Sequence, residues 1–184
     1  MNLMNLPTDL PKLEQDGGCD HLLNTTIPEI ALPTQDGNLL RLNRFDTFQL
    51  VLFCYPMTGH PGRPLPENWD AIPGARGCTL QNFSFRDSYD DLIKCNALPV
   101  GVSTQPVFDI KEMSNRLSIP YDIVSDEESK LSSTINLPTF SIGKKKFLKR
   151  VTLIIEKAVI KKVFYPIFSP NKHINEVLEW LNKY

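Results

Sequence analysis

Five consecutive apolar residues, Leu50-Val51-Leu52-Phe53-Cys54, constrain the fold of this chain more than any other stretch. An apolar run without polar alternation is typical of a strand whose two faces are both covered, as in parallel and mixed sheets. No apolar run in the chain approaches the ~18 residues that a helix needs to cross a bilayer. We therefore expect residues 50–55 to form a central strand, and we expect no membrane-spanning segment.

Strand and helix patterns alternate on both sides of this strand. Apolar segments at 27–32 and 39–42 flank Asp36-Gly37, which is a hairpin signal. The later segments are predicted to be a helix 79–95, a strand 97–103, a helix 107–117, a strand 121–124, a short helix 125–136, a hairpin of 151–155 and 159–165, and an amphipathic helix from Ile174 onward. This order predicts an α/β domain with a thioredoxin-like fold: a mixed central sheet flanked by helices on both faces, with an N-terminal β-hairpin extension.

The domain is expected to span residues 22–184, because residues 1–21 are polar and punctuated by Pro and Gly, as in an N-terminal arm. Cys19 and His21 in this arm are candidate metal ligands, but the other histidines fall at no ligand-like spacing, so no metal site is predicted. A formal net charge of −1 provides no field that would attract nucleic acid or an anionic membrane. The lysines around 144–162 are interpreted as a solvated hairpin face.

Cysteine usage and the N-terminus bear on the location of the protein. Four cysteines without a regular pattern do not indicate a disulfide scaffold. The N-terminus shows no basic segment followed by an apolar one, so no secretory signal is predicted. The expected location is the cytoplasm, where thiols stay reduced.

Cys78 is the candidate reactive residue. A Pro- and Gly-rich loop follows the strand and ends at Gly77, and the sequence turns helical directly after Cys78. Free backbone N–H groups and the positive end of the helix dipole stabilise a thiolate at such a position. A buried structural cysteine is the alternative, although a loop of this composition is an unusual place for one. Arg76 is either a partner of the thiolate or a solvated side chain.

Several segments together resemble the peroxiredoxins, specifically the bacterioferritin-comigratory-protein or PrxQ side of that superfamily. The resemblance covers residues 25–184 and rests on Phe53-Cys54-Tyr55-Pro56, Pro73-Gly74-Ala75-Arg76-Gly77-Cys78-Thr79, Phe85-Arg86-Asp87, Gly101-Val102-Ser103-Thr104 and Lys149-Arg150-Val151-Thr152-Leu153-Ile154-Ile155. The Thr58-Gly59 and Trp69-Asp70 segments are similar to a proteobacterial subgroup with a lengthened catalytic loop.

The resemblance implies a thiol-dependent peroxidase without a cofactor or metal, acting on hydrogen peroxide or organic hydroperoxides. Cys78 matches the peroxidatic cysteine, Arg150 the arginine that holds thiolate and peroxide, and Pro56 the proline that shields the site. The usual motif has a threonine where this chain has Ala75. Thr58 is the first candidate to supply the missing hydroxyl, and Thr79 is the second.

The usual resolving cysteine of PrxQ-like proteins is also replaced, here by Phe83. Cys95 is expected at the far end of the same helix, about 25 Å from Cys78, too far for a disulfide. Cys54 and Cys19, the latter expected on a mobile arm, remain as alternatives. The leading interpretation is a one-cysteine mechanism in a monomer or homodimer, with resolution by thioredoxin, glutaredoxin or a low-molecular-weight thiol. The rival hypotheses are a non-enzymatic redox-sensing or interaction protein on a degenerate peroxiredoxin fold, and a thiol-dependent transferase.

Overall fold

A computed structural model describes residues 10–184 of the chain, and its centre is the strand that the apolar run predicts. Strand β3 (Gln49–Cys54) lies in the middle of a five-stranded sheet of order β5-β4-β3-β8-β9. It pairs in parallel with β4 and antiparallel with β8, so the sheet is mixed, as predicted. Leu50 to Cys54 have no exposed surface, because both faces of the sheet are covered.

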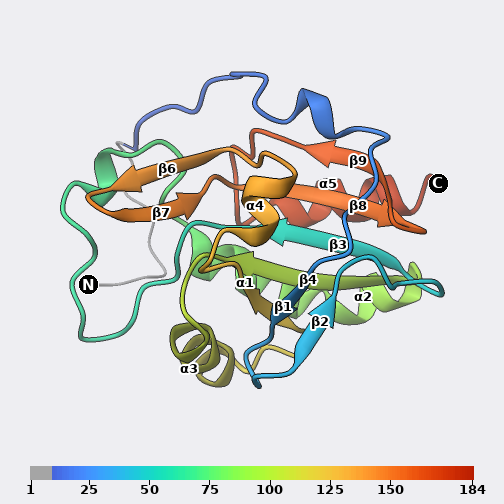
Figure 1. Cartoon of the computed structure of the whole chain (residues 1–184), viewed down its shortest axis with the longest axis horizontal. Coiled ribbons are helices and arrows are strands. Elements are labelled where there is room, and N and C mark those ends of the chain that lie inside the picture. The colour runs from blue at the N-terminus through green and yellow to red at the C-terminus, as the bar shows by residue number, and fades with distance from the viewer. Residues whose placement is uncertain (1–9) are drawn as a thin grey trace.

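The remaining elements follow the predicted order closely (Figure 1). They are β1 (Ala31–Pro33), β2 (Leu39–Arg41), α1 (Cys78–Asp87), α2 (Tyr89–Lys94), β4 (Ala97–Ser103), α3 (Val107–Leu117), β5 (Ile123–Ser125), α4 (Lys130–Thr134), β6 (Thr139–Ile142), β7 (Lys145–Leu148), β8 (Val151–Glu156), β9 (Val159–Phe164) and α5 (His173–Leu181), with short 3₁₀ turns at Asp20–Leu22 and Trp69–Ala71.

Different elements cover the two faces of the sheet. One core cluster joins alternate β3 residues, Val51 and Phe53, to apolar residues of α1, α2, α3 and α5. The other cluster joins Leu50, Leu52 and Cys54 to α4, the N-terminal segment and the β1–β2 hairpin. Side chains alternate across a strand. Consecutive residues of β3 therefore belong to different cores. As a result, Cys54 lies in a different core from Cys78.

Two helical predictions need correction. The helix predicted for 79–95 is divided at Ser88, whose φ of −104° and ψ of 14° leave the helical region, consistent with the weak preference of Ser and Asp for helix interiors. The helix predicted to begin at Ser125 begins at Lys130. The Asp126 carboxylate accepts hydrogen bonds from the backbone N–H groups of Leu131 and Ser132 at 2.8 and 3.0 Å. These bonds cap the N-terminus of α4 at its observed start, five residues after the predicted one.

The β6–β7 hairpin was missing from the predicted order of elements. It forms a separate two-stranded sheet beside the main one and turns at Gly143. Figure 1 shows it next to the long loop that connects β3 to α1. Lys144, Lys145 and Lys146 at its turn are exposed, as expected for a solvated hairpin face.

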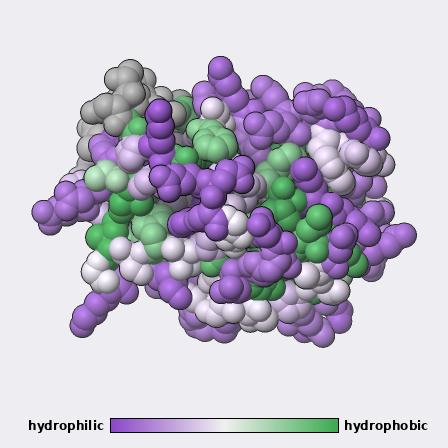
Figure 2. Space-filling model, turned by 90° about the horizontal axis from the view of Figure 1, so that it is seen from above, coloured by the Kyte–Doolittle hydropathy of each residue, from purple (hydrophilic) through white to green (hydrophobic). Residues whose placement is uncertain are grey.

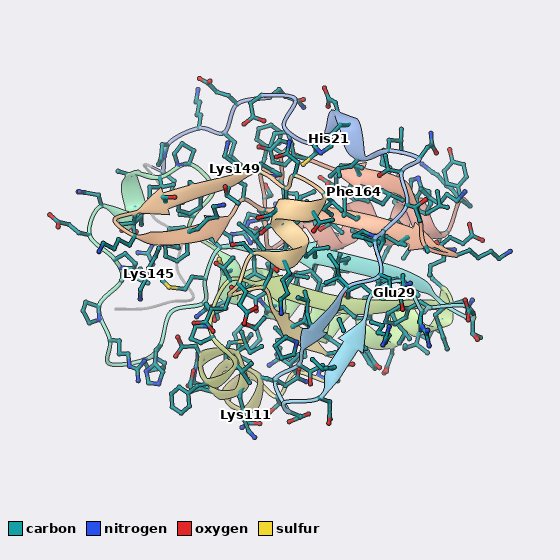
Figure 3. All side chains as sticks on the ribbon, in the orientation of Figure 1. His21, Glu29, Lys111, Lys145, Lys149 and Phe164 are labelled. Atoms are coloured by element: carbon teal, nitrogen blue, oxygen red, sulfur yellow. The ribbon has the colours of Figure 1, made fainter. Side chains whose placement is uncertain are left out.

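The described part of the N-terminal arm, residues 10–21, lies on the domain. Asp16 accepts hydrogen bonds from Lys149 Nζ at 2.7 Å and from the Tyr165 hydroxyl at 3.0 Å, and Figure 3 shows Lys149 on the side where the arm runs. The Lys149 contact is the main reason why the pKa of Asp16 falls to about 2. The expectation that Cys19 is mobile is wrong, because this side chain is only 2% exposed.

The face in Figure 2 is largely hydrophilic, with apolar residues in small separate groups. Among residues 10–184, no helix has the length and apolar character that crossing a membrane requires.

Candidate active site

Cys78 is the first residue of α1, where the sequence places the change from loop to helix. The preceding Gly77 has a φ of +98°, which glycine adopts readily and other residues rarely do. The first intrahelical bond runs from the Gln81 N–H to the Gly77 carbonyl at 2.9 Å, so the N–H groups before it have no helical acceptor. The Cys78 side chain is 3% exposed, and its thiol donates to the Ala75 carbonyl at 3.4 Å.

Arg150 lies beside this thiol and is 4% exposed. It directly precedes β8, the antiparallel neighbour of β3. Its Nη2 contacts the Cys78 sulfur at 3.4 Å and donates to the Gly74 and Arg76 carbonyls at 3.3 and 3.0 Å. Its Nη1 donates to the side-chain oxygen of Gln81. The guanidinium therefore connects the loop, the reactive thiol and the first turn of the helix.

The other predicted site residues are Pro56, Thr58 and Thr79. Pro56 is buried at the end of β3, where it cannot continue the strand ladder, and its carbonyl accepts from the Ser103 hydroxyl at 3.1 Å. Thr79 is 5% exposed and shares the first turn of α1 with Cys78. The Thr58 hydroxyl donates to Gln105 at 3.2 Å. Thr58 lines a different hollow, of about 350 Å³, between the loop, α3 and the β6–β7 hairpin. Lys145, which is labelled in Figure 3, also lines this hollow.

Packing against the hairpin holds the long loop in place. Trp69 is 3% exposed and packs on Phe140 and Phe147 with ring-centroid distances of 5.9 and 5.2 Å. Ala75 is fully buried in the same small cluster as Trp69 and Phe147. The hydroxyl of a threonine at position 75 would therefore enter an apolar environment. This packing agrees with a short side chain at the position where the resemblance expects threonine.

Arg76 corresponds to neither of the two predicted alternatives. It forms an ion pair with Asp70, with Nε–Oδ1 and Nη2–Oδ2 distances of 2.6 and 3.1 Å, and its side chain is only 10% exposed. This pair closes the loop on itself. The backbone carbonyl of Arg76, rather than its guanidinium, takes part in the site by accepting from Arg150.

Sequence reasoning missed three residues at the site. Gln81 is fully buried and holds Arg150. Asn82, also fully buried, donates to the Cys78 carbonyl at 3.0 Å. Burial, and to a smaller degree the nearby Cys78, raises the pKa of Tyr55, so its phenol stays protonated. The only sequence signal was the position of two polar amides, Gln81 and Asn82, within one turn of a candidate nucleophile.

The remaining cysteines lie away from this centre. Cys54 and Cys19 belong to the core on the opposite face of the sheet from Cys78. Burial raises the pKa of both thiols, that of Cys19 to about 12, so neither is readily ionised. Cys95 follows α2, where its sulfur contacts Asn182 Oδ1 at 3.6 Å. Phe83, at the usual resolving position, is covered by the Arg86 guanidinium at 4.2 Å from the ring centroid.

A hollow of about 330 Å³ opens beside Arg150. Its lining is mainly apolar and comes from the arm, the loop and the segment after β9, including Leu13, Ile72, Ile167 and Phe168. The arm closes tightly on this side, since a Cβ atom added to Gly74 would lie 2.9 Å from Leu13. Among the described residues no cluster of His, Cys, Asp and Glu is suited to hold a metal ion.

The site combines a single sulfur at a helix N-terminus with a buried guanidinium that faces it, on a mixed α/β sheet. A model of the AhpC/TSA family matches residues 71–163, just over half of the chain, and includes both Cys78 and Arg150. The chain belongs to the AhpC/TSA family.

Individual relatives agree with this assignment. The chloroplastic peroxiredoxin Q of Populus jackii is 30% identical over 84% of this chain and 65% of its own length, and that of Sedum lineare is 29% identical over 85% and 76%. The chain thus spans slightly less than two thirds of the poplar protein.

Solved structures share the thioredoxin-like peroxiredoxin fold. The peroxidoxin BcpB of Mycobacterium tuberculosis superposes with a TM-score of 0.72 at 24% identity, over 88% of this chain and 96% of its own. A peroxiredoxin Q of Xanthomonas campestris superposes with a TM-score of 0.66 at 18% identity, over 96% of this chain and 99% of its own. The prediction of a thioredoxin-like fold is therefore confirmed.

Proposed function

We propose that this protein is a thiol-dependent peroxidase that reduces hydrogen peroxide or organic hydroperoxides through Cys78. The observation that carries the proposal is the 3.4 Å contact between Arg150 Nη2 and the Cys78 sulfur at the start of α1. Both the guanidinium and the helix N-terminus favour the thiolate over the thiol. The same donors are placed to stabilise the negative charge that develops on the departing peroxide oxygen.

The reaction balances without a metal or an organic cofactor. The thiolate attacks one peroxide oxygen, the O–O bond breaks, and the leaving alkoxide or hydroxide takes a proton to become an alcohol or water. Cys78 is then a sulfenic acid. An external thiol attacks it, water leaves, and a mixed disulfide forms, which a second thiol reduces to regenerate Cys78 while the external thiols become a disulfide.

The positions of the cysteines support an external reductant. Cys54 and Cys19 are buried on the opposite face of the sheet, and Phe83 replaces the usual resolving cysteine. We propose thioredoxin, glutaredoxin or a small thiol as the reductant of a monomer or homodimer. A reducing compartment, with the cytoplasm as the leading proposal, fits four cysteines that are all free.

The apolar hollow beside Arg150 suits a hydroperoxide with a hydrocarbon group. A bacterioferritin comigratory protein of Xanthomonas campestris with the same fold has been studied for its alkyl peroxide reduction activity. This likeness supports the inclusion of organic hydroperoxides among the proposed substrates of this chain.

Steady-state peroxide consumption with a dithiol reductant tests the proposal. Cys78→Ser is expected to abolish turnover without loss of the fold, whereas Cys54→Ser, on the other face of the sheet, serves as the matched control and should keep it. Activity that survives in the first variant and disappears in the second would show that the nucleophile is misassigned.

A redox-sensing protein is the second candidate function. Two observations favour it: Ala75 provides no hydroxyl at the usual position, and Cys78 is only 3% exposed. The same assay separates the two functions, because a sensor consumes one equivalent of peroxide and then stops.

A further inference from the structure

The N-terminal arm supplies one wall of the hollow beside Arg150. Residues 10–13 line this hollow together with the loop before Cys78 and the segment after β9. Leu13 of the arm also borders a second, smaller cavity that Arg150 lines. The arm and Arg150 therefore border the same space.

Leu13 lies directly on the loop that leads to Cys78. A Cβ atom added to Gly74 would lie 2.9 Å from Leu13 Cδ2, a distance at which one of the two residues would have to move. The Gly74 carbonyl in turn accepts from Arg150 Nη2 at 3.3 Å, and the same nitrogen contacts the Cys78 sulfur at 3.4 Å. Leu13 is thus connected to the reactive sulfur through a short series of contacts.

Asp16 fixes this wall in place. Its carboxylate accepts from Lys149 Nζ at 2.7 Å, from the Tyr165 hydroxyl at 3.0 Å and from the Gly18 N–H at 3.0 Å. Lys149 is the residue directly before Arg150, so the arm is attached next to the guanidinium. Three residues after Asp16, Cys19 is buried in the core. Leu13 therefore belongs to a segment with a defined position on the domain.

The hollow combines an apolar wall with a positive charge. Its apolar lining includes Leu13, Ile72, Ile167 and Phe168. Among the described residues that line it, the charged ones are Lys12, Arg76 and Arg150, all of them cations. Its volume of about 330 Å³ lies within the range of small-molecule sites. A ligand with a hydrocarbon group and an electron-rich oxygen end fits this combination.

We propose that Leu13 is a specificity-determining residue: it forms the arm's side of the wall against which the hydrocarbon group of an organic hydroperoxide packs. The proposal rests on the proposed peroxidase function and deepens it by assigning substrate selection to the N-terminal arm. The thiolate of Cys78 attacks the terminal peroxide oxygen and the O–O bond breaks. The alcohol that leaves after taking up a proton carries the hydrocarbon group out of the hollow. Hydrogen peroxide has no such group, so its reaction does not use this wall.

The test is Leu13→Asn, compared with Leu13→Met, in the full chain. Asparagine has the branched shape of leucine but is polar, whereas methionine keeps an apolar side chain of similar volume. The second-order rate of Cys78 oxidation is measured with cumene hydroperoxide and with hydrogen peroxide. The asparagine variant should lose about 10-fold with cumene hydroperoxide, the lower end of what one methylene contributes in an enclosed pocket, because Leu13 is only half-buried. Its rate with hydrogen peroxide should stay within about twofold of the wild type.

The methionine variant should keep both rates within about twofold of the wild type. Glu14→Gln, at the exposed neighbour of Leu13 in the arm, is the matched control and should change neither rate. An asparagine variant that reacts with cumene hydroperoxide as fast as the wild type refutes the proposal. An equal loss with both peroxides also refutes it, because selection would then not depend on the hydrocarbon group. A methionine variant that loses as much as the asparagine variant shows that an apolar wall at this position is not the cause.

Alkylation separates the failure of this proposal from the failure of the peroxidase function. N-benzyliodoacetamide carries a hydrocarbon group to the Cys78 sulfur, and iodoacetamide does not. If the wild type turns over no peroxide while Leu13→Asn slows only the benzyl reagent, the peroxidase function is refuted and the apolar wall at Leu13 stands. If turnover is normal and Leu13→Asn reacts like the wild type with both reagents and both peroxides, the role of Leu13 is refuted and the peroxidase function stands.

Discussion

Replacement of Arg150 by methionine is the perturbation that tests the site most directly. The variant keeps an unbranched side chain of similar reach but removes the cation that contacts the Cys78 sulfur at 3.4 Å. A hydrogen bond to a charged group contributes about 1.5–3 kcal/mol, so the thiolate-to-thiol ratio should fall about 10- to 150-fold. Each tenfold fall in this ratio corresponds to ~1.4 kcal/mol, and thiolate absorbance measures it.

The loss of reactivity should depend on the reagent. Alkylation by iodoacetamide needs only the thiolate, so its rate should fall in proportion to the thiolate fraction. The peroxide rate should fall further, because the proposed function assigns Arg150 the second role of stabilising charge on the peroxide oxygens. Arg150→Lys is the matched control, since it keeps a charge but loses the fork that binds both the sulfur and the loop carbonyls. An unchanged titration together with an unchanged peroxide rate in the methionine variant would refute this reasoning.

Three further predictions follow from other parts of the molecule. Peroxide should leave Cys78 as a sulfenic acid that dimedone traps, and excess peroxide should oxidise it further to the sulfinic acid. A stoichiometric disulfide between Cys78 and Cys54 or Cys19 in a non-reducing peptide map would contradict this prediction. Asp16→Asn should lower the free energy of unfolding by less than about 1 kcal/mol, because this ion pair is exposed. Trp69→Ala should lower it by about 3–5 kcal/mol and expose the long loop to proteases, and an unchanged denaturation midpoint would show that the loop is held by other contacts.

The effect of Asp16 has a defined pH dependence. Its folded-state pKa of about 2 lies below the ordinary 3.8, so its contribution is present above about pH 4 and disappears as the pH falls toward 2. Wild type and Asp16→Asn should therefore differ in urea unfolding near neutrality and converge in acid. A difference that persists unchanged at the lowest pH would show that the carboxylate charge is not the cause.

Local patterns predicted the sheet and most of the helices because each depends on residues that are close in sequence. The apolar run at Leu50 identified β3, and the spacing of apolar residues identified α3 at its observed bounds. The β6–β7 hairpin was missed because its strands are short, and half of their residues are polar or charged. Ser88 divided a helix whose apolar face continued across the break.

The site was predictable only in part, for a similar reason. The change from loop to helix in the sequence was enough to predict Cys78. Only the resemblance to the peroxiredoxins predicted that Arg150 lies beside it. The hydrogen bond between Thr58 and Gln105 depends on the connection between β4 and α3, 47 residues further along the chain, so the sequence position of Thr58 gave no indication of this partner. Gln81 looked like an ordinary polar helical residue until the fold brought Arg150 against it.

Trp69 docks the long loop between β3 and α1 onto the β6–β7 hairpin, which, in the described part of the chain, shares no ladder with the five-stranded sheet. We therefore expect the loop and the hairpin to open together as one cooperative unit while the central ladder stays intact. Under the proposed peroxidase function, a reductant that reaches the oxidised sulfur would need such an opening. The aromatic packing of Trp69, some distance from Cys78, would set the free-energy cost of that opening. Native-state hydrogen exchange should then find the amides of β6 and β7 opening together with the loop, at lower denaturant than those of β3.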